Sequence, residues 1–311
     1  MTKSYTSATR GPRALLREVR NLRKVYSRDP KAEMQALVER LRAVEELVEE
    51  RFDVVLEDMK MLDVGAGQRL LQMKYFALRN SVVGIDLDVI PQGFDPAGYF
   101  RMLRANGLKR TVKTIGRKVL GVDTRQSREL LTLVGGSRFP RLEVHHMDAG
   151  AMTFVDRSFD FVYSMVVFQH LSDPGSVAEE MARVLAPGGI AYADFILYTS
   201  PTGSHDIRLL GGRSADLPFW AHLRPQHEHL IQQSAYLNGL RLKEWERIFE
   251  SAMPRHELIL VQPGRENLEP EASRLKRQGE LSDYSMDELV TTKVILLWRK
   301  PLDRSSPAES Q

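Results

Sequence analysis

Short apolar runs that end on an acid or at a turn recur along this chain, and they predict buried β-strands. Apolar residues at helical spacing lie between several of these runs, as over residues 34–48 and 242–253. This alternation predicts an α/β fold, with a doubly wound, mostly parallel seven-stranded sheet and helices on both faces. The runs expected to form strands are 61–64, 81–86, 142–146, 159–168, 190–197, 257–261 and 292–298.

Two stretches interrupt the alternation. Residues 87–141 place apolar positions among many cations and predict an inserted helical lobe, whereas residues 199–240 are dense in His, Trp, Arg and Pro and predict a second insertion. The rest of the chain is expected to form a helical N-terminal extension at 1–55, a main domain at 56–300 and a flexible tail at 301–311.

The composition fits a globular protein, because 42% of the residues are hydrophobic and 27% are charged. Cysteine is absent, which excludes disulfides, thiolate metal sites and cysteine nucleophiles. No apolar run approaches the roughly 18–20 residues that span a bilayer, and the N-terminus lacks a secretory apolar segment, so we expect a cytoplasmic protein. Leu15, Val19, Leu22 and Tyr26 share one helical face, which favours a packing helix over an Arg-rich organelle transit peptide.

The net charge of +3 is unevenly distributed. Residues 1–30 hold eight Lys or Arg against two acids, and residues 101–128 hold nine against Asp123 alone. Apolar residues between the cations of the second patch favour peripheral binding to an anionic membrane surface. RNA is the alternative partner, but the patches lack the interleaved aromatic residues of an RNA-binding module.

The stretch 61–71 reads Met-Leu-Asp-Val-Gly-Ala-Gly-Gln-Arg-Leu-Leu, a strand that ends in a glycine-spaced turn and opens into a helix. Gly65 and Gly67 would let the backbone approach a bound molecule closely, so a phosphate-binding loop is one interpretation. Leu70 stands where the dinucleotide fingerprint has its third glycine, which counts against a pyrophosphate. A plain strand-to-helix turn also fits so short a match.

A second acid changes this picture, because Asp86 ends the next predicted strand about twenty residues after the glycines. A carboxylate there can accept hydrogen bonds from both hydroxyls of a ribose. The turn and the acid together predict a nucleoside ligand. Asp63, beside the turn, can attract a cationic group of that ligand directly or through water.

Short motifs follow in the order Asp63-Val-Gly-Ala-Gly67, Gly84-Ile-Asp86, Met147-Asp148-Ala149, Phe159-Asp-Phe-Val-Tyr163, Phe168-Gln-His-Leu171 and Leu185-Ala-Pro-Gly-Gly189. As an ordered set, these motifs resemble the class I S-adenosylmethionine-dependent methyltransferases. The resemblance implies a Rossmann-like methyltransferase fold with S-adenosylmethionine as cofactor.

The resemblance also implies which residues contact the cofactor. In this family the glycine loop passes beside the methionine end, the acid after the second strand holds the ribose, and the acid after the third strand faces the adenine. Gln68-Arg69 departs from the family, which often has another glycine there, and a surface turn is the alternative role for Asp148. The implied contacts are Asp63, Gly65, Ala66, Gly67, Asp86, Leu87, Asp148, Ala149 and Gln169.

The family pattern places the acceptor beyond the carboxyl ends of the fourth and fifth strands, and this brings His170 and the loop with His205 to one region. A histidine with a pKa near neutrality can accept a hydroxyl proton. His205 is the first candidate, because Gly203 and Ser204 predict a mobile loop; His170 is second and His222 third.

The second half of the chain offers further groups. Trp220, Tyr236 and Trp245 could stack on a sugar ring or form the core of a substrate lid at 199–240. The histidines there show no recognised metal-ligand spacing, so no metal is expected.

The leading hypothesis is methyl transfer to a hydroxyl on a carbohydrate or glycolipid, because the second half resembles in outline a subgroup found with bacterial cell-surface polysaccharide genes. The basic patches leave an RNA methyltransferase or RNA-binding protein as an alternative. A non-catalytic module that binds the cofactor is the third, since fold alone does not establish function.

Overall fold

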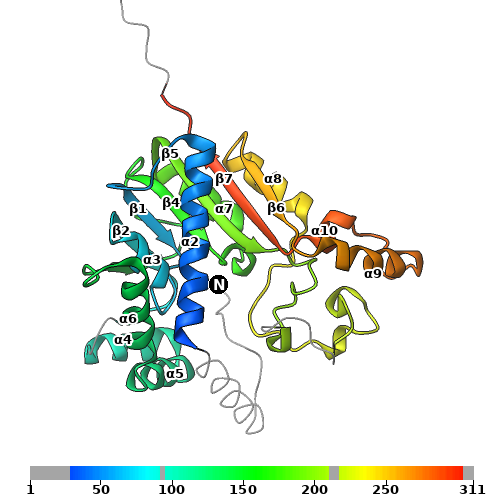
Figure 1. The fold of residues 1–311 in the computed structure, drawn as a ribbon, viewed down its shortest axis with the longest axis horizontal. Coiled ribbons are helices and arrows are strands. Elements are labelled where there is room, and N and C mark those ends of the chain that lie inside the picture. Colours follow the sequence, from blue (N-terminus) through cyan, green and yellow to red (C-terminus); the bar gives the residue numbers. More distant parts are fainter. Residues whose placement is uncertain (1–28, 92–94, 210–216, 304–311) are drawn as a thin grey trace, which may run out of the picture. The chain divides into compact units, whose positions relative to one another are not determined.

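The computed structural model describes residues 29–91, 95–209 and 217–303. The predicted helix around Leu15 and most of the predicted tail at 301–311 lie outside these residues. The chain forms two compact units, whose elements are labelled in Figure 1. The first unit comprises the described parts of 29–163 and 184–189, and the second comprises those of 164–183 and 190–303.

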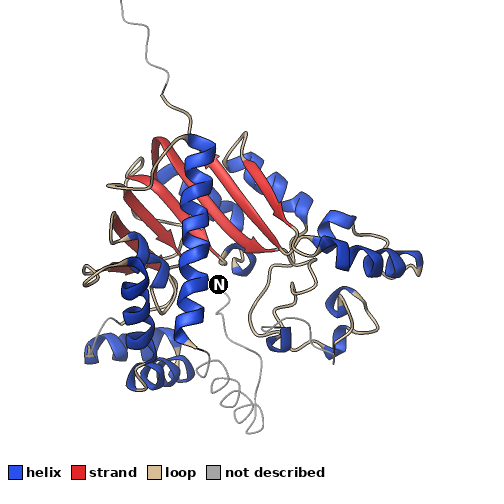
Figure 2. Cartoon of the chain, in the orientation of Figure 1, coloured by secondary structure: helices blue, strands red, loops and turns tan. Residues whose placement is uncertain are grey.

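The described residues form the seven predicted strands: β1 (Lys60–Val64), β2 (Ser81–Asp86), β3 (Glu143–His146), β4 (Phe159–Met165), β5 (Leu185–Ile196), β6 (Glu257–Val261) and β7 (Lys293–Arg299). In the first unit β1 pairs in parallel with β2 and β4, and β2 pairs in parallel with β3. In the second unit β7 runs antiparallel to both β5 and β6. The strands, red in Figure 2, follow the order β3-β2-β1-β4-β5-β7-β6 given by their hydrogen-bonded neighbours, so the predicted doubly wound, mostly parallel sheet is confirmed.

The register of the first unit brings three strand ends together. Asp63 of β1 lies opposite Gly84 of β2, and Asp86 at the end of β2 lies opposite His146 at the end of β3. The N–H of Met147 donates to the carbonyl of Asp86 at 3.0 Å. Because parallel strands end at the same sheet edge, the turn after β1, the end of β2 and the segment after β3 are neighbours.

The helices of the first unit are α2 (Pro30–Phe52), α3 (Leu71–Phe76), α4 (Pro96–Asn106), α5 (Leu108–Val119) and α6 (Val122–Val134). α2 begins where the side chain of Asp29 accepts a hydrogen bond from the N–H of Lys31 at 3.0 Å. Predicted apolar positions such as Val38 and Leu41 are buried, and α2 packs against α3 and α6 (Figure 1). Helices α4 to α6 are the predicted helical lobe within 87–141.

The helices and 3₁₀ turns of the second unit are η1 (Phe168–His170), α7 (Pro174–Val184), η2 (Ile207–Leu209), η3 (Ala221–Leu223), η4 (Glu228–Leu230), α8 (Leu242–Ala252), α9 (Arg265–Arg277) and α10 (Met286–Val290). α7 ends at Val184 and passes directly into β5 at Leu185. A Cβ on Gly189 would lie 3.0 Å from the carbonyl oxygen of Asp160, so the glycine there permits close approach of two backbones. No helix in the described ranges has the length and apolarity needed to cross a bilayer.

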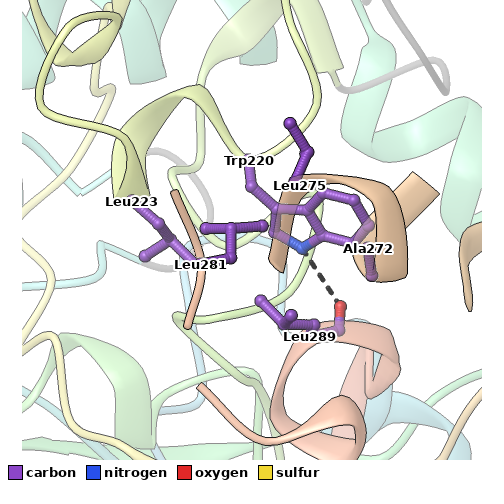
Figure 3. Packing of buried hydrophobic residues seen from close by; sticks show 6 residues of the cluster. All are labelled: Trp220, Leu223, Ala272, Leu275, Leu281 and Leu289. Atoms are coloured by element: carbon purple, nitrogen blue, oxygen red, sulfur yellow. Dashed lines mark hydrogen bonds between the residues drawn. The ribbon is translucent and has the colours of Figure 1, made fainter. Parts of the chain in front are cut away.

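The charged stretch between β6 and β7 forms α9 and α10, which sequence analysis did not predict. Leu268, Ala272 and Leu275 repeat at helical spacing in α9, and the charged residues between them hid this pattern. These residues pack with Trp220, whose Nε1 donates to the carbonyl of Leu289 at 3.1 Å (Figure 3). The cluster of buried residues comprises Trp220, Leu223, Ala272, Leu275, Leu281 and Leu289.

The two tryptophans considered for sugar stacking are core residues. Trp220 and Trp245 are each 1% exposed. The Trp245 ring lies 4.4 Å from the ring of Phe195 and stacks on Phe249 at 5.8 Å, measured between centroids. Of the three aromatic residues, only Tyr236 is half-buried rather than enclosed, so stacking on the tryptophans is ruled out by burial.

Candidate functional site

The glycine turn after β1 is bonded to β2. The N–H groups of Gly65 and Ala66 both donate to the carbonyl of Ile85, at 2.9 and 3.0 Å. Gly65 and Gly67 have φ values of 84° and 67°, in the left-handed region that glycine adopts without strain. Because these N–H groups are engaged with β2, the turn does not present the row of donors that a pyrophosphate needs, in agreement with the missing third glycine at Leu70.

Asp86 closes the turn from the end of β2. Its Oδ2 accepts a hydrogen bond from the N–H of Gly67 at 2.8 Å, and its Oδ1 accepts one from the N–H of Asp88 at 2.7 Å. Burial raises the pKa of Asp86, and the two backbone hydrogen bonds oppose that rise. Each carboxylate oxygen can accept a further hydrogen bond, so the group suits two neighbouring hydroxyls of a ribose.

Asp63 lies in β1 and is 3% exposed. Its Oδ2 and the hydroxyl of Tyr163 are both buried, lie near each other and have no other hydrogen-bond partner among the described residues. Burial raises the pKa of Asp63 to about 8, the neighbouring Tyr163 hydroxyl lowers it, and the carboxylate of Asp86 raises it. A buried carboxylate with only a neutral hydroxyl beside it suits an ammonium group or a bridging water.

The other predicted cofactor contacts of this unit are more accessible. Leu87 is 51% exposed, and Ala149 is half-buried. Asp148 is exposed, and its Oδ1 accepts a hydrogen bond from the N–H of Gly150 at 2.9 Å. Asp148 therefore closes a surface turn, the alternative that the sequence left open, and its contact with an adenine stays a prediction.

Cations of the helical lobe bind residues that follow β1 and β2, next to the glycine turn. Sequence analysis did not predict these contacts. Arg110 of α5 forms an ion pair with Asp88. Arg117 donates to the carbonyl of Gln68 at 3.2 Å, and the amide of Gln68 donates to Asp88 at 3.3 Å. Gln68, which replaces a frequent glycine of the family, thus ties the turn to the lobe. A charge pair so distant in sequence leaves no local signal.

The second unit carries Gln169 and His170 on η1. Nδ1 of His170 lies 2.7 Å from the carbonyl oxygen of Tyr236, so it bears the proton and donates it. Nε2 then accepts from the amide of Gln169 at 3.3 Å, and the same amide nitrogen donates to the carbonyl of Val166 at 3.2 Å. Burial lowers the pKa of His170. Both ring nitrogens of His170 are therefore engaged, while Oε1 of the buried Gln169 has no partner within the described chain.

His205 lies beside His170, which confirms that the chain brings these histidines to one region. Their ring centroids are 4.9 Å apart and the rings are nearly perpendicular, at 89°. Nε2 of His205 is buried and has no hydrogen-bond partner in the described part of the chain. Burial, and after it the neighbouring His170, lowers the pKa of His205 to about 4. The near-neutral pKa expected from the sequence is therefore wrong for His205, because burial makes it a neutral imidazole at pH 7 and a weaker base, with Nε2 available to take a proton.

The loop that carries His205 is fixed by contacts that the sequence did not reveal. A Cβ on Gly203 would lie 1.9 Å from the carbonyl oxygen of Tyr198, so this glycine serves close packing rather than the predicted mobility. Asp206 is fully buried and binds the guanidinium of Arg208 through two hydrogen bonds, at 2.9 and 2.7 Å. Its Oδ2 also accepts from the N–H of Gln232 at 2.7 Å. Asp206 therefore positions the loop on which His205 stands.

His222 has a structural partner. Its Nε2 donates to the carbonyl of Tyr198 at 2.7 Å, and burial lowers its pKa to about 4. His222 and Thr202 line a cavity of about 210 Å³ in the second unit, whose other walls are mainly aliphatic and aromatic, such as Leu217 and Phe219.

No group of three or more His, Asp or Glu side chains among the residues described is arranged to hold a metal ion.

Backbone strain occurs at the turn after β4. Val166 has a φ of 59°, which is a rare conformation for a β-branched residue. Its N–H donates to the backbone carbonyl and to Oδ1 of the fully buried Asp194, at 2.8 and 3.0 Å. Oδ2 of Asp194 accepts from the hydroxyl of Tyr192 at 3.1 Å. These bonds hold the strained turn two residues before η1, which carries His170.

Comparison with known proteins agrees with this architecture. Residues 103–193 match the family model of a methyltransferase domain. A stretch of 114 residues is 34% identical to an uncharacterized methyltransferase of Mycolicibacterium gilvum (strain PYR-GCK), covering 34% of this chain and 44% of that relative. A stretch of 64 residues is 39% identical to 27-O-demethylrifamycin SV methyltransferase of Amycolatopsis mediterranei (strain S699), covering 20% and 24%.

The chain thus spans less than half the length of these relatives. Phosphoethanolamine N-methyltransferase 2 of Haemonchus contortus, solved in complex with S-adenosyl-L-methionine, is 18% identical with a TM-score of 0.43, covering 83% of this chain and 52% of that one.

The strand order with a reversed β7, the glycine turn and the acid after β2 define a class I methyltransferase fold. Residues 103–193 match a methyltransferase domain, and the fold and motifs of the chain are similar to those of the class I methyltransferases, which use S-adenosylmethionine as cofactor. The site fits this molecule, because Asp86 offers two acceptor oxygens for the ribose and the buried carboxylate of Asp63 can attract the amino group. A turn without a phosphate cradle is also suited to it.

The raised pKa of Asp63 predicts that cofactor binding depends on pH. Below about pH 8 the free protein holds this carboxyl protonated, whereas the ligand's ammonium group favours the carboxylate, so binding releases a proton. The affinity for S-adenosylhomocysteine should therefore rise about tenfold per pH unit as pH approaches 8. Asp63→Asn has no proton to release at this position, so its affinity should rise less steeply with pH. Calorimetry in buffers of different ionisation enthalpy counts the protons, and equal release by both proteins would contradict the assignment.

Two neutral, buried histidines predict a loss of stability in acid. The pKa values of His205 and His222 are lowered from 6.5 to about 4, so as pH falls below 6.5 the unfolded chain binds protons first. Their contribution is fully present above pH 6.5 and is lost progressively toward pH 4. His222→Gln keeps a donor for the Tyr198 carbonyl but cannot be protonated, so urea unfolding should show a smaller loss between about pH 7 and about pH 5. In the control His229→Gln, where the histidine is exposed, the free energy of unfolding should decrease as much as in the wild type. An equal decrease in His222→Gln would refute this explanation.

Proposed function

We propose that this protein transfers the methyl group of S-adenosylmethionine to a hydroxyl group of a glycolipid or carbohydrate. The observation that carries the proposal is the buried, unpartnered Nε2 of His205 beside His170, within the described residues of the second unit. A hydroxyl must lose its proton as the new bond to carbon forms, whereas a neutral amine can attack first. A neutral histidine with an unengaged ring nitrogen supports the hydroxyl acceptor.

Each residue then has a defined role. S-adenosylmethionine, when bound, supplies a methyl group on a sulfonium, which is a good leaving group. Asp86 holds the ribose and Asp63 holds the amino group, so the protein's own contribution is chiefly alignment and the exclusion of water. His205 accepts the hydroxyl proton at Nε2, and Asp206 keeps its loop in place.

The surroundings of His222 support an acceptor with an apolar part. The cavity lined by His222, Leu217 and Phe219 is mainly apolar and suits an acyl chain or a hydrophobic ring better than a free sugar. The burial of Trp220 and Trp245 removes two faces on which a sugar could stack. The similarity to a protein named for methylation at an oxygen, 27-O-demethylrifamycin SV methyltransferase, also favours a hydroxyl. We therefore favour a glycolipid, in keeping with the proposed link to bacterial surface polysaccharides.

A labelled-methyl assay tests the proposal. The protein is incubated with S-adenosylmethionine that carries a radioactive methyl group and with separated lipid, glycan and RNA fractions of the host. Label in the lipid or glycan fraction supports the proposal, and label in RNA favours an RNA methyltransferase. Absence of label from all fractions, together with normal cofactor binding, favours a non-catalytic cofactor-binding module.

A further inference from the structure

Helix α5 exposes an apolar face. Leu108, Val112, Ile115 and Val119, here called the α5 stripe, recur at intervals of three and four residues and lie on one side of the helix. Leu108 is 67% exposed, Val112 59% and Val119 70%. Such a stripe normally faces the core of a protein.

The opposite face of α5 is polar and buried. Thr111 and Thr114 are almost fully enclosed, and the hydroxyl of Thr111 donates to the carbonyl of Gly107 at 3.0 Å. Compared with an ordinary surface helix, α5 therefore has its apolar face toward solvent and its polar face toward the protein. Two ion pairs fix this orientation, since Arg110 binds Asp88 and Arg117 binds Asp123.

The positive charge around the α5 stripe indicates which kind of partner could bind there. Helices α4 and α5 with their flanking residues, 96–121, contain seven Lys or Arg and no Asp or Glu. Arg101, Arg110 and Arg117 form ion pairs with aspartates outside this range, and within the range itself no acid offsets the seven positive charges. An apolar face within a field of positive charge is complementary to an anionic lipid surface.

Other occupants fit less well. A second copy of the lobe would bring like charges together, and so would residues 1–30, with eight cations against two acids. A nucleic acid would satisfy the cations but would bury none of the exposed Leu and Val side chains.

We propose that the α4–α5 lobe, residues 96–121, docks on the surface of an anionic lipid bilayer with the α5 stripe inserted into the headgroup region. The docking is independent of methyl transfer, because it rests on the exposed stripe and the charge of the lobe alone. The cations that face inward hold the lobe to the turn after β1, so the docked element belongs to the same unit as the cofactor site.

Co-sedimentation of the full chain with vesicles tests this proposal. Binding is measured on phosphatidylcholine vesicles with and without phosphatidylserine, at about 0.1 M and about 0.5 M salt. We expect binding only to vesicles with phosphatidylserine, and weaker binding at the higher salt. Equal binding to both kinds of vesicle, or to neither, would overturn the proposal.

Two sets of variants distinguish the contribution of the α5 stripe to vesicle binding from that of the positive charge. Leu108→Ser, Val112→Ser and Val119→Ser combined should reduce vesicle binding at least about tenfold, because the inserted side chains are lost. The matched control, Val55→Ser with Val155→Ser, changes two equally exposed valines of the same unit and should bind like the wild type. Lys113→Gln should weaken binding about fivefold, as one surface cation is removed.

Three further results would contradict docking on lipid. If the triple variant melts at a lower temperature, the stripe is covered by another segment of this chain. If sedimentation shows that the triple variant dissociates a dimer, the occupant is a second copy. If poly(U) displaces the protein from vesicles at equal charge concentration and the triple variant binds vesicles normally, the partner is a nucleic acid.

Discussion

Replacing Asp86 with alanine should weaken the binding of S-adenosylmethionine and S-adenosylhomocysteine by about 10- to 100-fold, or roughly 1–3 kcal/mol. The carboxylate supplies two acceptor oxygens for the ribose, and hydrogen bonds to a charged acceptor are stronger than neutral ones. The variant also removes the partner of the Gly67 N–H, which closes the turn at 2.8 Å. Isothermal calorimetry measures both affinities.

A matched control exists in the same sheet. Oδ2 of Asp160 accepts a hydrogen bond from the N–H of Lys60 at 2.9 Å, where β1 begins rather than where it ends. Asp160→Ala should therefore bind both ligands like the wild type. Gly65→Val should weaken binding at least as much as Asp86→Ala, because a β-branched residue is strained at a φ of 84°. Unchanged affinity of Asp86→Ala would show that the ribose is held elsewhere.

Replacing His205 with alanine should reduce turnover by about 10²- to 10⁴-fold, the range expected for loss of a general base. Affinity for S-adenosylhomocysteine should not change, since the cofactor contacts come from the turn after β1 and from Asp86. With a pKa of about 4, His205 stays neutral over the usual range, so turnover should be constant between about pH 6 and about pH 8 and fall only toward pH 4.

The exposed His229→Ala is the control for this variant and should keep full turnover. His170→Ala should have a smaller effect than His205→Ala, because both of its ring nitrogens are already engaged. Nearly full turnover of His205→Ala with normal cofactor binding would mean that alignment alone suffices or that another group accepts the proton.

The sheet, and the residues at the ends of β1 and β2 that are proposed to bind the cofactor, could be predicted because their signals are local in sequence. Each buried strand is a short apolar run, and parallel strands end at one edge, so Asp63, Gly65 and Asp86 had to come together once the strands were assigned. The placement of His170 and His205 in one region came from the resemblance to the methyltransferase family, which places the acceptor beyond the ends of the fourth and fifth strands.

Features that depend on tertiary partners could not be predicted. Nδ2 of Asn238 donates to the carbonyls of Phe168 and Leu171 at 2.9 and 3.1 Å and so holds η1, yet no pattern around an isolated asparagine indicates this. Val166 adopts a strained φ at a turn where Asp194, distant in sequence, binds its N–H. The sequence suggested a peripheral helix in this segment, but not that Thr111 and Thr114 form its buried face.

Transfer of a ¹³C-labelled methyl group, followed by NMR of the purified product, tests the central claim most directly. The protein is mixed with labelled S-adenosylmethionine and the acceptor fraction that takes up the label, and the product is isolated before measurement. We predict a methyl carbon with the chemical shift of a carbon bonded to oxygen, formed by the wild type and strongly reduced with Asp86→Ala and with His205→Ala. A methyl group bonded to nitrogen or to carbon, or no labelled product although S-adenosylmethionine binds, would contradict methyl transfer to a hydroxyl.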